Sequence, residues 1–242
     1  LVAGVDGLTV ANGITTLGAG TVNTNAFTFT LNGVIDGAGS IVKTGSGNLV
    51  LNGANTYTGG TNVTAGTVTA GNNTAFGTNT VTMADGTTLA NNTDNLVIAN
   101  NFSIGNVTVA TGANTFTMNG VVSGAGLMTK TGSGNLVLNG ANTYTGGTAL
   151  TAGTITVGTN TALGTGRLTA SDATSLVAGV NGLNVANLVT LNGGLTVDSN
   201  TDSFELSGVI DGAGSITKVN SGNLILSGVN TYTGGTNVTA GE

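Results

Sequence analysis

Apolar and polar residues alternate along many short stretches of this chain, and the alternation predicts β-strands almost everywhere. Residues Ala26–Leu31 (AFTFTL) have the period of two that is typical of a half-buried strand. Similar stretches, rich in β-forming residues and bounded by Gly or Asn, are Asn48–Asn52, Thr67–Ala70, Thr80–Met83, Asn95–Ala99, Ser103–Val109 and Thr115–Met118. No window keeps a helical period, so we predict an all-β protein.

The same alternation assigns side chains to the two sides of each strand. The apolar residues expected to point inward are Leu49, Leu51, Val63, Val68, Leu136, Leu138, Leu150, Ile155, Leu224, Leu226 and Val238. Val50, Val137 and Ile225 each lie between two inward leucines, so we expect them to face outward. We expect the outward Thr and Asn side chains to form ladders of hydrogen bonds between neighbouring strands.

The chain is an internal repeat. The stretch Gly45–Gly66 (GSGNLVLNGANTYTGGTNVTAG) recurs, slightly changed each time, at Gly132–Gly153 and at Ser221–Gly241. Counted between the single tyrosines of these stretches (Tyr57, Tyr144 and Tyr232), the spacings are 87 and 88 residues. We interpret residues 1–242 as a single segment of a longer repeat array, with copies near 1–88, 89–175 and 176–242.

Short strands inside such a repeat favour a solenoid over a sandwich or a barrel, because each unit of a repeat array contacts mainly its neighbours. Asn52-Gly53 and Asn139-Gly140 would suit hairpin turns, but the Thr-Tyr-Thr-Gly-Gly-Thr that follows suits a corner, where glycine tolerates unusual backbone angles. We therefore predict a right-handed parallel β-helix (β-solenoid). With about 22 residues per turn, each copy would make about four turns, and the chain would make about eleven turns and stand about 50 Å tall.

The composition of the chain argues against nucleic-acid binding and against a membrane-spanning helix. Charged residues make up 6% of the chain, and the net charge is −6, with only Lys43, Lys130, Arg167 and Lys218 positive. No basic face for nucleic acid can be built from so few cations, and no apolar run has the about 18 residues of a membrane-spanning helix. Charges stacked on neighbouring strands would repel, but equivalent lysines would lie about 19 Å apart, beyond the screening length of about 8 Å.

The stretches Gly33–Gly66, Gly120–Gly153 and Gly208–Gly241 resemble the passenger-associated transport repeat of bacterial autotransporters. The motif NTYTGGT returns three times in them, each time with Leu-x-Leu before it and Ala-Gly after it. The resemblance implies a β-helical passenger of a Gram-negative surface protein, exported through an outer-membrane barrel and used as an adhesin or a stalk. We expect neither a signal peptide nor a terminal barrel within residues 1–242, and the repeat is unusually regular. Both features leave open another extracellular fibre built from the same turn.

Two common catalytic side chains are missing from the sequence. The chain contains no His and no Cys, which excludes Ser-His-Asp and Cys-His catalysis and zinc sites built on these ligands. Asp198 and Asp202 would lie about 13 Å apart in an extended strand, farther than the about 5–9.5 Å that separate glycosidase carboxylates. The same stretch resembles the start of a calcium loop, but Ser203 and Val209 stand where that loop needs Gly and Glu. We expect no catalytic residue, no cofactor and no metal.

Tyr57, Tyr144 and Tyr232 are the candidate interaction residues. Aromatic residues are only 4% of the chain, and tyrosine is enriched in interfaces, so an exposed tyrosine in every copy would suit contact with a partner or a sugar. The alternative is that each ring packs over a corner while its hydroxyl forms a hydrogen bond. Because every copy has this tyrosine, we favour the packing role.

Together these observations predict a structural or adhesive extracellular segment of a bacterial surface protein rather than an enzyme. The first hypothesis is an autotransporter passenger that serves as a stalk or adhesin scaffold. The second is a segment or subunit of a filament assembled end to end, and a polysaccharide-active enzyme is a distant third. The expected partners are other copies of the repeat, a continuation of the same chain, and a host-cell or surface receptor, with no nucleic acid and no membrane insertion by this segment.

Overall fold

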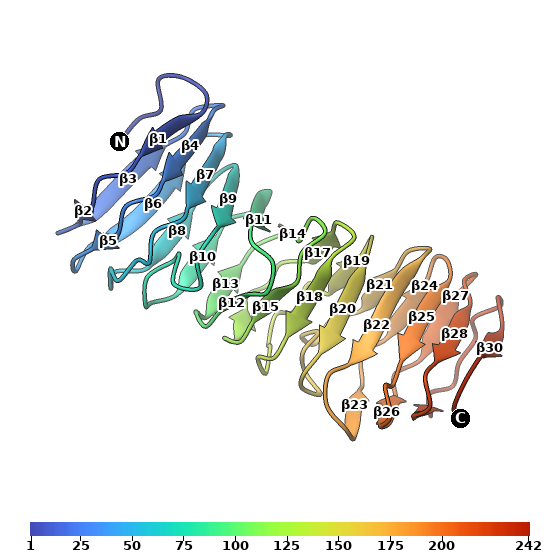
Figure 1. Cartoon of the computed structure of the whole chain (residues 1–242). Helices are drawn as coiled ribbons and strands as arrows, with labels where there is room; N and C mark the ends of the chain where they lie inside the picture. The colour runs from blue at the N-terminus through green and yellow to red at the C-terminus, as the bar shows by residue number, and fades with distance from the viewer.

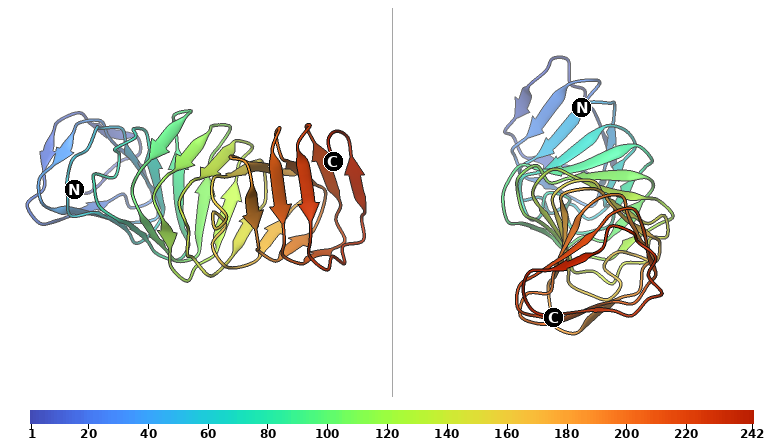
Figure 2. Two further views of the ribbon diagram at one scale, coloured as in Figure 1. Left: turned by 90° about the horizontal axis from the view of Figure 1, so that it is seen from below. Right: turned by 90° about the vertical axis from the view of Figure 1, so that its right-hand side faces the viewer.

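The chain forms an elongated column of stacked turns, as seen in a computed structural model that describes all 242 residues (Figures 1 and 2). The strand pairs are parallel, so neither Asn-Gly pair forms a hairpin. In Figure 1 the strands nearest the viewer, such as β22 (Thr174–Ala178), run down the page while the chain advances to the right, so the coil is right-handed. The predicted fold class is confirmed, and the chain contains no helix long and apolar enough to span a membrane.

Each turn is shorter than expected. Leu8 pairs with Phe29, Phe29 with Leu49, and Leu49 with Val68, so a turn takes 19 to 21 residues instead of about 22. The 242 residues therefore make about twelve turns rather than eleven. At about 4.8 Å per turn, the column is about 58 Å tall.

Three faces surround the column, and the chain visits them in a fixed order in every turn. Face 1 consists of β3 (Ala19–Asn23), β6 (Ser40–Thr44), β8 (Thr61–Val63), β10 (Val81–Met83), β13 (Phe102–Ile104) and β16 (Val122–Ser123), and later of β23 (Leu183–Val185), β26 (Ser203–Leu206) and β29 (Asn223–Leu226). Face 2 is one eleven-stranded sheet of β1 (Leu8–Val10), β4 (Thr28–Leu31), β7 (Asn48–Leu51), β9 (Thr67–Ala70), β11 (Thr87–Asn91), β14 (Val107–Ala110), β17 (Met128–Thr131), β19 (Thr148–Leu150), β21 (Leu168–Ala170), β24 (Val189–Leu191) and β27 (Ile210–Gly212). Face 3 consists of β2 (Ile14–Thr15) and β5 (Ile35–Asp36), and then of β12 (Leu96–Ile98), β15 (Phe116–Met118), β18 (Asn135–Leu138), β20 (Thr154–Val157), β22, β25 (Leu195–Asp198), β28 (Ile216–Val219) and β30 (Thr236–Val238).

The sequence repeat does not coincide with the turns of the column. Strand β6 lies on face 1, its counterpart β17 in the second copy lies on face 2, and β28 in the third copy lies on face 3. The reason is arithmetic, because 87 residues exceed four turns of 19 to 21 residues by about one third of a turn. Each copy therefore makes about four and one third turns instead of the expected four. Equivalent residues of successive copies consequently lie on successive faces of the column.

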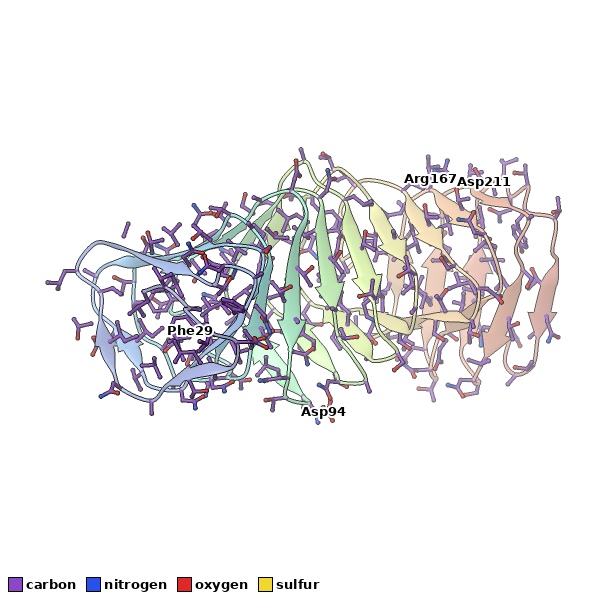
Figure 3. All side chains as sticks on the ribbon, turned by 90° about the horizontal axis from the view of Figure 1, so that it is seen from above. Phe29, Asp94, Arg167 and Asp211 are labelled. Carbon is purple, nitrogen blue, oxygen red and sulfur yellow. The ribbon has the colours of Figure 1, made fainter.

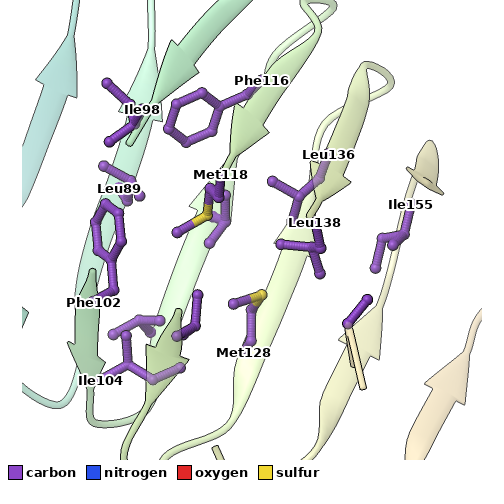
Figure 4. Packing of buried hydrophobic residues seen from close by; sticks show 14 of the residues in the cluster. Leu89, Ile98, Phe102, Ile104, Phe116, Met118, Met128, Leu136, Leu138 and Ile155 are labelled. Atoms are coloured by element: carbon purple, nitrogen blue, oxygen red, sulfur yellow. The ribbon is translucent and has the colours of Figure 1, made fainter. Parts of the chain in front are cut away.

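The core is a continuous stack of inward side chains, which form one cluster of 49 buried residues. Leu136 pairs in register with Phe116 on one side and Ile155 on the other, and the three stack in Figure 4. The inward assignment is confirmed for the residues of the first two copies, which are fully buried: Leu49, Leu51, Val63, Val68, Leu136, Leu138, Leu150 and Ile155. Their alternation with polar neighbours is what allows short, uncharged strands to enclose a dry interior.

Three sequence-based assignments need correction. Val50 points outward but is only 8% exposed, because Thr30 and Thr69 lie opposite it on the two neighbouring strands. Val238 was expected in the core but is 53% exposed, because β30 pairs only with β28 and no turn stacks beyond it; Leu224 and Leu226 in the last turns are only partly buried. The expected strand Ser103–Val109 is two strands, β13 and β14, separated by a corner.

Polar side chains outside the core connect successive turns, as the sequence predicted. Asn52 Nδ2 donates to Asn32 Oδ1 at 2.8 Å, and the corresponding bond in the second copy joins Asn139 to Asn119, also at 2.8 Å. Thr69 Oγ1 donates to Asn48 Oδ1 at 2.9 Å in the same manner. These ladders satisfy amides and hydroxyls that carry no charge, which explains how the surface remains polar with so few ionised groups.

Candidate functional site

The NTYTGGT motif crosses one face of the column without forming a strand, and a buried asparagine replaces the missing strand contacts. Asn55 Oδ1 accepts a hydrogen bond from the Ile35 amide at 2.8 Å, and its Nδ2 donates to the Ala75 carbonyl at 2.6 Å. Ile35 belongs to the turn before and Ala75 to the turn after, so one side chain joins three turns. Asn142 repeats both contacts in the second copy.

The motif tyrosines lie under this strandless face. Tyr57 and Tyr144 are fully buried, and their hydroxyls hydrogen-bond to the Oγ1 atoms of Thr61 and Thr148 at 2.5 and 2.6 Å. Burial raises the pKa of Tyr57 to about 12 and also raises the pKa of Tyr144. Tyr232 in the last turns is only partly buried and pairs with Thr236. Two of the three candidate interaction residues thus present no surface to a partner, and their geometry is that of packed core residues.

The most unexpected feature of each copy is a buried lysine. Lys43, Lys130 and Lys218 are at most 1% exposed, so their charges lie inside the column and not on its surface. The Nζ atom of Lys43 donates to the carbonyl oxygens of Thr44, Gly45 and Ala65 at 3.1, 2.7 and 2.9 Å. No carboxylate lies within salt-bridge distance of any of the three, since the chain contains one ion pair elsewhere.

The other two lysines make the same contacts in their own copies. Lys130 donates to the carbonyls of Thr131, Gly132 and Ala152, and Lys218 donates to those of Val219, Asn220 and Ala240. Burial lowers the pKa of Lys43 and of Lys130 to about 8. A signal for this position was present in the alternation, because Lys43 follows the inward Ile41 by two residues, but its charge argued against burial.

The carbonyl oxygens around each lysine come from two stacked corners. Gly45 and Gly66 have φ values of 80° and 72°, which glycine adopts without strain. At these corners no backbone amide donates to the oxygens of Gly45 or Ala65. The lysine ammonium supplies the missing donors, which is why a charged side chain is stable inside the column.

The carboxylates do not form a metal-binding cluster. No group of three or more His, Cys, Asp or Glu residues is close enough to hold a metal ion. Asp198 instead accepts hydrogen bonds from the Asn200 amide at 2.7 Å and from Asn220 Nδ2 at 2.8 Å, so it stabilises a corner. Asp202 lies beside it in a shallow polar hollow on the surface.

The single ion pair clamps three turns on the outer surface of face 2. Arg167 Nη1 lies 2.9 Å from Asp211 Oδ2, and the hydroxyl of Thr190, in the turn between them, donates to Asp211 Oδ1 at 2.7 Å (Figure 3). The Thr190 hydrogen bond and the Arg167 guanidinium together lower the pKa of Asp211. Sequence reasoning missed this pair, because its members are 44 residues apart and neither belongs to a motif.

Comparison with known proteins agrees with the repeat. The model of the passenger-associated transport repeat matches residues 41–70, 128–157 and 216–242. The chain is similar to the adhesin BmaC autotransporter of Brucella suis biovar 1 (strain 1330), with 35% identity over 143 residues. This match covers 57% of the chain but only 4% of the length of that relative. No solved structure matches the chain. The residues that the repeat model matches fall on the three stretches that carry NTYTGGT, so the resemblance to autotransporter passenger β-helices is confirmed.

Proposed function

We propose that this chain, a β-solenoid built on three passenger-associated transport repeats, is a segment of an autotransporter passenger that spaces or presents an adhesive region at the bacterial surface. In this role the segment works outside the cell and catalyses no reaction. The similarity to an adhesin autotransporter supports both the location and the adhesive setting. The activity of the whole passenger belongs to a much longer protein, of which this chain resembles a small part.

The observation that carries the proposal is the continuity of the column. One cluster of 49 buried residues runs through it, and the eleven-stranded sheet of face 2 connects nearly all the turns. A stack without an interruption in its core or its longest sheet resists bending, because every turn is bonded to both of its neighbours. A stiff rod about 58 Å tall is what a stalk or scaffold requires.

Surface display tests this function directly. The chain would be fused between an outer-membrane anchor and a distal epitope, and bacteria carrying it would be compared with bacteria carrying the anchor and epitope alone. We expect the epitope to lie about 58 Å farther from the membrane, and attachment to host-cell layers to increase. An unchanged epitope distance together with unchanged attachment would refute the proposal.

The two ends of the column support a second proposal about partners. Leu1 and Ile14 line an apolar hollow at the first turn, and Val238 is exposed at the last. We propose that further turns of the same polypeptide cover these surfaces, so that residues 1–242 form one part of a longer solenoid. The alternative, a filament of separate subunits stacked end to end, predicts concentration-dependent polymers of the isolated chain, which sedimentation velocity would detect.

A further inference from the structure

Two shallow grooves on the column have the same lining, although they lie in different copies of the repeat. The first is lined by Asn73, Thr74, Gly77, Thr78, Ala99 and Asn100, and has a volume of about 250 Å³. The second is lined by the corresponding residues Asn160, Thr161, Gly164, Thr165, Ala186 and Asn187, and has a volume of about 240 Å³. Each groove lies between a loop that passes one turn after the motif tyrosine, residues 73–78 or 160–165, and the two residues that directly follow the strand of the next turn, β12 or β23.

A nearly buried asparagine at each groove keeps a free acceptor. Asn100 is 7% exposed, and its Nδ2 donates to the carbonyls of Gly77 and Asn79 at 3.1 and 2.6 Å. Asn187 is 8% exposed and donates to Gly164 and Gly166 at the same two distances, 3.1 and 2.6 Å. Both N–H groups of each amide are therefore used, while no protein group donates to Oδ1. The two hydrogen bonds fix the amide of a residue that lines the groove, and its oxygen acceptor is unused within the protein.

The opposite wall offers a donor. Asn73 Oδ1 accepts a hydrogen bond from the Val97 amide at 2.9 Å, which orients the exposed side chain and leaves its NH₂ group free. Asn160 has the same relation to the Asn184 amide, also at 2.9 Å. No charged side chain lines either groove, and the methyl group of Ala99 or Ala186 supplies a small apolar surface. An uncharged ligand with hydroxyl groups next to C–H groups fits this lining.

We propose that the two grooves are equivalent binding sites for neutral sugar residues of a surface glycan. Asn100 Oδ1 and Asn187 Oδ1 accept a hydrogen bond from a sugar hydroxyl, and the amides of Asn73 and Asn160 donate to a second hydroxyl. The inference rests on the proposed function, because it names the chemistry that the adhesive segment contacts. Each site is shallow and has no aromatic platform, so a single groove binds weakly.

The geometry of the repeat makes two weak sites useful. The grooves are 87 residues apart in the sequence, which separates them by about 21 Å along the column and by one third of a turn around it. The first borders face 3 and the second borders face 1, so a column inserted into a glycan layer meets ligands from two directions. Linked weak sites of this kind gain about 10²–10⁴-fold in apparent affinity over either site alone.

Groove-filling substitutions test the proposal in the intact chain. Ala99→Ile and Ala186→Ile place an apolar branched side chain in each groove without altering the core, since both alanines are exposed. Ala54→Ile and Ala141→Ile, at the exposed alanines that directly precede the NTYTGGT motif, serve as matched controls. The probe is a printed array of neutral and sialylated oligosaccharides, supplemented by NMR titration of the side-chain amides of Asn100 and Asn187 with the best neutral oligosaccharide.

We expect the wild-type chain and both controls to bind neutral glycans, each single groove variant to lose at least about tenfold in apparent affinity, and the double variant to lose binding. The amide signals of both asparagines should shift in the titration. Binding by the double variant at the wild-type level, or the absence of binding to any neutral glycan, overturns the inference. If either result is found while bacteria that display the wild-type chain still attach to host cells better than bacteria with the anchor and epitope alone, only the groove assignment fails. If display of the wild-type chain gives no such increase in attachment, the proposed function itself is refuted.

Discussion

The ammonium group of Lys43 lies 2.9 Å from the carbonyl oxygen of Ala65, in the following turn of the column. The bond joins two corners across the stack, and each copy of the repeat contains its equivalent. In a protein with only four basic residues, three are therefore internal donors and only Arg167 acts at the surface. The scarcity of positive charge on the outside of this chain is even greater than its composition indicates.

Replacing a buried lysine should destabilise the column. In Lys130→Met the carbonyl oxygens of Gly132 and Ala152 lose the donor that Nζ provides, at about 1–3 kcal/mol for each unsatisfied group. We expect the free energy of unfolding in urea to fall by about 2–4 kcal/mol at pH 7. Arg167→Met, which removes an exposed ion pair, is the matched control and should cost less than about 1 kcal/mol. Equal losses for the two variants would contradict the role assigned to Lys130.

The lysines also predict a rise in stability in mild alkali. Their pKa falls from 10.5 to about 8 on folding at Lys43 and Lys130, so between these values the unfolded chain binds more protons than the folded one. Stability then increases as pH rises through this window, by up to about 3 kcal/mol for each lysine. Thermal melts between pH 7.5 and 10 should show the increase, and the double variant Lys43→Met/Lys130→Met should lack it. A melting temperature that stays constant in the wild-type chain would exclude the shift.

The tyrosines predict the opposite trend at higher pH. Burial raises the pKa of Tyr57 from 10.0 to about 12, so above pH 10 the unfolded chain loses protons that the folded chain keeps. The stabilisation, about 3 kcal/mol at this site, is complete below pH 10 and is lost as pH rises through about 12. Tyrosinate absorbance at 295 nm, recorded during alkaline titration of a Tyr232→Phe variant so that only the two buried tyrosines report, should appear together with unfolding. Tyrosine ionisation near pH 10 in a chain that remains folded would mean that Tyr57 and Tyr144 are accessible.

A core substitution tests the two sides of a strand. Leu136 is fully buried between Phe116 and Ile155, so we expect Leu136→Ala to cost about 2–5 kcal/mol. Its neighbour Val137 lies on the outer side of the same strand and is only partly buried, so Val137→Thr should cost far less. Urea melts of the two variants give the comparison directly. Similar losses would show that the inward and outward assignments are mistaken.

A glycine substitution tests how closely the turns stack. A Cβ atom added to Gly126 would lie 1.8 Å from the carbonyl oxygen of Gly105 in the preceding turn, whereas one added to Gly18 would have no atom within 4 Å. We expect Gly126→Ala to cost about 1–3 kcal/mol or more through displacement of the backbone. Gly18→Ala should leave the melting temperature nearly unchanged. If both variants melt like the wild-type chain, the turns are farther apart than described.

The amino-acid sequence by itself determined the class of fold, because its signals are local. Alternation within four or five residues decides which side chains can leave water together, and so Leu49, Leu51, Leu136 and Leu138 could be assigned to the core without a structure. The repeat of NTYTGGT required a stack of similar units, which excluded a globular domain with distant pairings. The same reasoning favoured a packing role for the motif tyrosine, and Tyr57 and Tyr144 are buried.

Only the tertiary structure decided the features that depend on how one turn meets the next. Turns of 19 to 21 residues follow from the tightness of the corners, and they place equivalent strands of successive copies on different faces. The burial of Lys43 required the carbonyl oxygen of Ala65, 22 residues farther along the chain, and the pairing of Arg167 with Asp211 spans 44 residues. The grooves beside Asn100 and Asn187 likewise join segments from different turns. A local sequence pattern does not contain such relations. Which residues of different turns become neighbours depends on the number of residues in each turn, and only the folded structure shows that number.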